Sequence, residues 1–130
     1  MEAREIIELH ELGFLDQHGN ICEETVGEIG YEDGETLGDL CCDLIPCGCE
    51  VALLEVEGQL KRDYYLRENK EFVEVLHQVC RLFNFELSED VSAMCMNNEI
   101  IDLYLQHFLI GYADMVLERL KSCRECRRGR

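Results

Sequence analysis

The segment from residue 98 to about residue 122 is apolar over most of the circumference of the helix that its spacing predicts. A helix that is apolar on nearly every side must be covered by other parts of a fold or by lipid. Lipid is disfavoured, because a charge such as Asp102 or Arg119 costs about 2.5 to 3.5 kcal/mol at the centre of a bilayer. We therefore expect a central helix of a bundle, capped by Asn97 or Asn98, and no membrane span. The apolar positions are Ile100, Ile101, Leu103, Tyr104, Leu105, Phe108, Leu109, Ile110 and Tyr112.

Shorter amphipathic segments predict the helices that cover it. Apolar residues recur at helical spacing in residues 2–13, 37–44 and 70–84, and Ser88 followed by two acids is typical of a further helix start. Residues 50–68 fit a strand as well as a helix, and we expect a helix because no hairpin chemistry follows. The predicted fold class is all-α, an irregular bundle of five or six helices with a long central C-terminal helix.

Residues 14–34 are rich in glycine, asparagine and aspartate, which commonly end helices and form turns. We expect a loop here with one short helical or hairpin piece, in which Gly27, Gly30 and Gly34 form turns. This leaves room for a short β-hairpin within residues 14–60.

The length of 130 residues and the apolar content of 47% suit one helical domain over residues 1–122, with an acidic N-terminal half, followed by a basic C-terminal tail at 123–130. The first residues lack the basic end and unbroken apolar stretch of a secretory signal. Nine cysteines are an odd number, which disfavours a complete disulfide framework. We expect a reduced, cytoplasmic protein.

Acidic residues are concentrated in the first half of the chain, where no lysine or arginine occurs between Arg4 and Lys61. Residues 1–60 carry 16 acidic and 1 basic side chains, whereas residues 61–130 carry 12 and 11. Such a surface repels nucleic acid and attracts a basic protein. The expected partner-binding residues are Glu23, Glu24, Glu28, Glu32, Asp33, Glu35, Asp39 and Asp43.

The sequence contains no phosphate-binding glycine loop, zinc-protease helix or nucleophile elbow, so we expect no enzymatic activity. The first hypothesis is a small inhibitor or adaptor that docks on a basic, nucleic-acid-binding enzyme or complex. Its carboxylates would occupy phosphate-contacting sites, which is nucleic-acid mimicry of the anti-restriction or anti-CRISPR kind. This hypothesis needs no cofactor and leaves a homo-oligomer open.

The alternative hypothesis is a cysteine-dependent zinc, iron–sulfur or redox protein, because thiolates bind these metals. Cys80 and Cys95 are instead expected to be small core residues, and His107 a core or groove residue. Two sets of residues have ligand chemistry: Cys41, Cys42, Cys47 and Cys49, and His18, Cys22, Cys123 and Cys126.

Overall fold

The structure is a computed structural model that describes residues 2–44 and 50–122. Its described residues form helices without a named strand, and they contain one isolated antiparallel bridge between Leu15 and Ile21. The predicted all-α bundle with a long C-terminal helix is therefore confirmed, and the hairpin within residues 14–60 is reduced to this bridge. The helices are α1 (Ala3–Glu11), α2 (Glu23–Leu44), α3 (Glu50–Leu66), α4 (Asn69–Leu82), α5 (Val91–Met94) and α6 (Asn98–Ser122).

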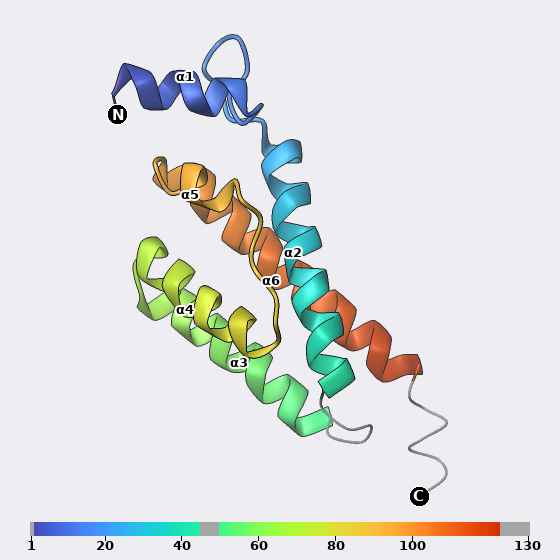
Figure 1. Cartoon of the computed structure of the whole chain (residues 1–130). Coiled ribbons are helices and arrows are strands. Elements are labelled where there is room, and N and C mark those ends of the chain that lie inside the picture. Colours follow the sequence, from blue (N-terminus) through green and yellow to red (C-terminus); the bar gives the residue numbers. More distant parts are fainter. Residues whose placement is uncertain (1, 45–49, 123–130) are drawn as a thin grey trace, which may run out of the picture.

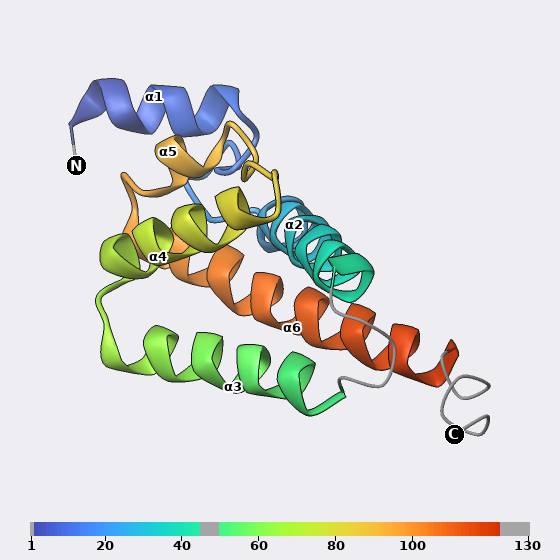
Figure 2. The ribbon, with the colours of Figure 1, turned by 60° about the horizontal axis from the view of Figure 1, so that its bottom comes forward.

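Helix α6 is the centre of the bundle, with α2, α3, α4 and α5 packed around it (Figures 1 and 2). The side-chain oxygen of Asn97 accepts hydrogen bonds from the backbone N–H groups of Glu99 (2.9 Å) and Ile100 (3.2 Å), so Asn97 is the predicted N-terminal cap. In the described part of the chain α6 is the helix whose length and hydropathy would suit a membrane span. Half of its most apolar 18-residue window is buried by the other helices, as expected for a core helix.

The expectation of a loop over residues 14–34 is wrong from residue 23 onward. Only residues 12–22 form a turn region, and α2 then continues unbroken for 22 residues. Gly27, Gly30 and Gly34 therefore lie inside a helix and not in turns. The helix expected at residues 37–44 is the second half of α2, which the structure describes as far as Leu44.

The remaining predicted helices agree with the structure in type and approximate extent. Residues 50–68 are helical in α3, and α4 covers the segment expected at residues 70–84. The helix expected at Ser88 begins three residues later and is a single turn long. Tyr64 attaches α3 to α6, because its hydroxyl donates a hydrogen bond of 2.6 Å to Asp102.

Helices α2 and α6 pack with their backbones in contact. A methyl group on Gly30 would overlap the carbonyl oxygen of Tyr104, and one on Gly34 would overlap that of Phe108. The approach is reciprocal, since a methyl group on Gly111 of α6 would overlap the carbonyl oxygen of Tyr31. The α2 glycines therefore shape the main helix pair, and they do so by lacking side chains rather than by forming turns.

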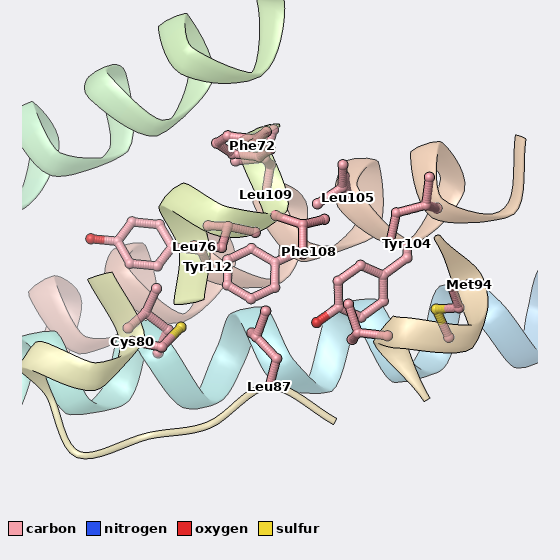
Figure 3. Packing of buried hydrophobic residues seen from close by; sticks show 14 of the residues in the cluster. Phe72, Leu76, Cys80, Leu87, Met94, Tyr104, Leu105, Phe108, Leu109 and Tyr112 are labelled. Carbon is pink, nitrogen blue, oxygen red and sulfur yellow. The ribbon is translucent and has the colours of Figure 1, made fainter. Parts of the chain in front are cut away.

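Next to its contact with α2, α6 also packs against apolar residues of α4 and of the segment that follows α4. Figure 3 shows Phe72, Leu76 and Cys80 on α4 and the Leu87 side chain rising from the connecting segment. Cys80 is fully buried, as expected, whereas Cys95 is only half-buried. The largest fully buried side chains include Tyr104, Phe108 and Tyr112 of α6 and Phe72 of α4.

Candidate interaction surface

The outer side of the N-terminal half of α2 carries five glutamates, which we call the acidic face: Glu23, Glu24, Glu28, Glu32 and Glu35. Four of them are exposed and Glu35 is half-buried. No lysine or arginine in the described parts of the chain forms an ion pair with any of them. Intervals of three and four residues keep Glu24, Glu28, Glu32 and Glu35 on one side of the helix, over about 17 Å of its length.

The acidic face surrounds an open depression of about 480 Å³ that also involves Gly27, Tyr31 and His107. Gly27 makes room for His107 of α6, because a methyl group on Gly27 would lie 3.0 Å from the imidazole ring. The hydroxyl of Tyr31 donates a hydrogen bond of 2.8 Å to Asp114, which raises the pKa of Tyr31 to about 12. The depression therefore combines carboxylates with a phenol and an imidazole, both held by the contact between α2 and α6.

Two of the predicted residues, Asp39 and Asp43, are already paired within the chain. The guanidinium of Arg119 on α6 bridges them, with 2.7 Å to Asp43 and a short contact to Asp39. These carboxylates raise the pKa of Arg119 further, so the bridge stays charged. The C-terminal end of the α2 acidic stripe is therefore partly neutralised, whereas the five glutamates of the acidic face have no such lysine or arginine partner among the described residues.

Asp33 does not belong to this surface, so its assignment to partner binding is wrong. Its carboxylate is buried and accepts hydrogen bonds from the Tyr104 hydroxyl (2.5 Å), the Ser88 hydroxyl (2.8 Å) and the Ser88 backbone N–H (3.0 Å). Asp33 lies one helical turn after Gly30, on the side of α2 that faces α6. Its carboxylate is occupied by hydrogen bonds within the fold and is not accessible to a partner.

The cysteine quartets are only partly open to a structural test, because Cys47, Cys49, Cys123 and Cys126 lie outside the described residues. Cys41 is buried in α2, and desolvation raises the pKa of its thiol to about 11. In residues 2–44 and 50–122, no three His, Cys, Asp or Glu side chains are placed to hold a metal ion. No observation in these ranges therefore favours the metal hypothesis.

The buried thiols make the folded protein sensitive to alkali. Burial raises the pKa of Cys41 to about 11 and of Cys80 to about 12, from an ordinary value of 9.0. A raised pKa in the folded state means that stability is fully present below pH 9 and decreases as the pH rises toward those values. We expect the free energy of unfolding, measured with urea, to fall between pH 9 and pH 10, and the fall to be shallower in Cys80→Ala. An equal slope in both proteins would contradict this account.

Sequence reasoning missed Tyr31 and the placement of His107 beside the acidic face. The available signal was the spacing of Gly27, Gly30 and Gly34, which places a side-chain-free strip of α2 against another helix. Tyr31 and the glutamates flank that strip, so they form the edges of the contact.

No protein-family model, curated protein or solved structure matches this chain. A function must therefore be argued from the chemistry of the described residues.

Proposed function

We propose that the protein is a non-enzymatic binding protein, an inhibitor or adaptor, whose acidic face docks on a basic surface of a partner protein. The observation that carries this proposal is the gathering of Glu23, Glu24, Glu28, Glu32 and Glu35 around one depression, with no cation of the described chain paired to them.

Like charges at this spacing work against the helix that carries them. The pairs Glu24–Glu28 and Glu28–Glu32 are four residues apart, and each such pair destabilises a helix by about 0.2 to 0.5 kcal/mol. A cationic partner surface relieves this repulsion on binding. The same field raises the association rate with basic proteins and acts over about 8 Å at physiological salt.

A partner that normally binds nucleic acid fits this charge best. Such proteins contact phosphates with arginine and lysine, and a row of exposed carboxylates about 17 Å long can occupy several of those contacts. The acidic face would repel nucleic acid itself, so the proposed role is competition with nucleic acid and not binding to it. Nucleic-acid mimicry is thus the specific form of docking that we propose.

The experiment uses the protein as bait for capture from its native host, with two variants that lose the same number of charges. One is Glu28→Gln/Glu32→Gln/Glu35→Gln on the acidic face. The control is Glu2→Gln/Glu8→Gln/Glu11→Gln, three exposed acids in or next to α1. Each lost contact with a charged partner group costs about 1.5 kcal/mol or more, so we expect the first variant to bind the wild-type partner at least 100-fold more weakly.

The control is expected to stay within about threefold of the wild type, and the binding should weaken as salt increases. Competition by duplex DNA for the captured partner tests the mimicry. Equal losses of affinity in both variants would show that binding depends on net charge alone. Binding that changes neither with salt nor with these substitutions would contradict the proposal.

A further inference from the structure

Residues 83–90 form an irregular segment between α4 and α5, which we call the strap. It connects to α4 through the Phe85 N–H, which donates to the Cys80 carbonyl (3.0 Å), and to α2 through Ser88, which donates to Asp33. The strap thus lies against both helices, and in Figure 3 its Leu87 side chain points toward Phe108 of α6.

A small number of interactions hold the strap in place. Leu87, which is 7% exposed, is its one buried apolar side chain, and Phe83 and Phe85 at its start are half-buried and pack against the core. From Glu86 to Glu89, the hydrogen bonds that the described residues show to α2, α4 or α6 are the two from Ser88 to Asp33. The chain enters the strap through Asn84 with a φ of 56°, a left-handed conformation that side chains other than glycine adopt infrequently.

Asp33 is therefore the main polar anchor of the strap. Its carboxylate receives both Ser88 donors and the Tyr104 hydroxyl, so it joins the strap to α2 and α6 at one point. Hydrogen bonds to a charged acceptor are stronger than neutral ones. Loss of this one carboxylate would release the strap and would also break the bond between α2 and the Tyr104 hydroxyl of α6, whereas loss of the Ser88 hydroxyl would affect the strap alone.

We propose that the strap opens and closes as one unit, with Asp33 as its lock, and that its opening gives solvent access to the thiol of Cys80. Cys80 is fully buried at the end of α4 where the strap begins, and Asp33 is close enough to contribute to the raised pKa of its thiol. Segments held by few buried contacts open at lower free energy than the whole fold. Opening of the strap would expose Cys80 while α2 and α6 remain packed against each other.

The test measures the rate at which iodoacetamide labels Cys80 in the native full-length protein, resolved at the level of the peptide by mass spectrometry. Backbone hydrogen exchange in α6 around Phe108 gives the rate of global opening for comparison. Ser88→Ala removes one donor to Asp33 and should speed Cys80 labelling about tenfold. Asp33→Asn should speed it more, and Ser88→Ala carries the test if Asp33→Asn does not fold.

The matched control is Val116→Ala, which creates a cavity at a buried position in the C-terminal half of α6 and involves no residue of the strap. It lies about 18 Å along the helix from Tyr104. We expect it to speed α6 exchange and leave Cys80 labelling unchanged, because strap opening does not break its packing. If Cys80 labelling follows α6 exchange in the wild type and in both kinds of variant, only global unfolding exposes the thiol and the strap proposal is wrong.

Discussion

Replacing Gly34 with alanine is expected to abolish stable folding, the largest effect that we predict for a single methyl group in this protein. The added carbon would overlap the carbonyl oxygen of Phe108 and lie 2.9 Å from the backbone N of Tyr112. Backbone atoms of a central helix cannot move away as a flexible side chain would, so α2 and α6 must separate. We expect a loss of more than about 4 kcal/mol, measured by urea unfolding followed by circular dichroism.

Gly58→Ala on α3 is the matched control for this prediction. Apart from its chain neighbours and the backbone of its own helix, no described atom lies within 4 Å of the position that its methyl group would occupy. Alanine is also the better helix former, so this variant should be about 0.5 to 1 kcal/mol more stable than the wild type. A Gly34→Ala protein with a urea midpoint near that of Gly58→Ala would show that the two helices do not pack this closely.

Helical periodicity was enough to predict most of the fold. The apolar residues of α6 predicted its central place, because no other soluble arrangement covers such a helix. The cap at Asn97 was also predictable, since it depends on residues next to each other in the chain. Local signals of this kind need no knowledge of the partner element.

The glycines of α2 could not be interpreted one residue at a time. A single glycine in a turn and a single glycine under a crossing helix can have the same sequence neighbours, so turn propensity does not distinguish them. Gly27, Gly30, Gly34 and Gly38 repeat at intervals of three and four residues, which is the spacing of one helix face. Had this interval been weighed against turn propensity, it would have predicted the long helix and its close contact.

The candidate surface was predictable in composition but not in detail. Asp33 is one of the eight acids expected to bind a partner, yet it lies on the same helix face as Val26, Gly30 and Leu37, which are buried. Asp39 and Asp43 differ from the acidic face only because the packing of α6 brings Arg119 beside them. Counting charges along the sequence cannot reveal such ion pairs, because the paired residues are about 80 positions apart.

Removing the carboxylate of Asp33 is expected to destabilise the protein by about 3 kcal/mol, because Asp33→Ala leaves buried donors without an acceptor. The Tyr104 hydroxyl is the most costly of these, since Tyr104 is fully buried. Tyr104→Phe removes the donor itself and should cost about 1 to 1.5 kcal/mol. Urea unfolding of each variant measures both values.

The double variant Asp33→Ala/Tyr104→Phe distinguishes a lost hydrogen bond from lost packing. If the carboxylate mainly serves to satisfy Tyr104, the second substitution should cost almost nothing once Asp33 is gone, giving a coupling energy of about 1 kcal/mol or more. Tyr31→Phe, which breaks the exposed bond to Asp114 between the same two helices, should be additive with Asp33→Ala. Additive losses for Tyr104→Phe as well would mean that Asp33 acts on α6 through packing alone, and that its charge is held by Ser88.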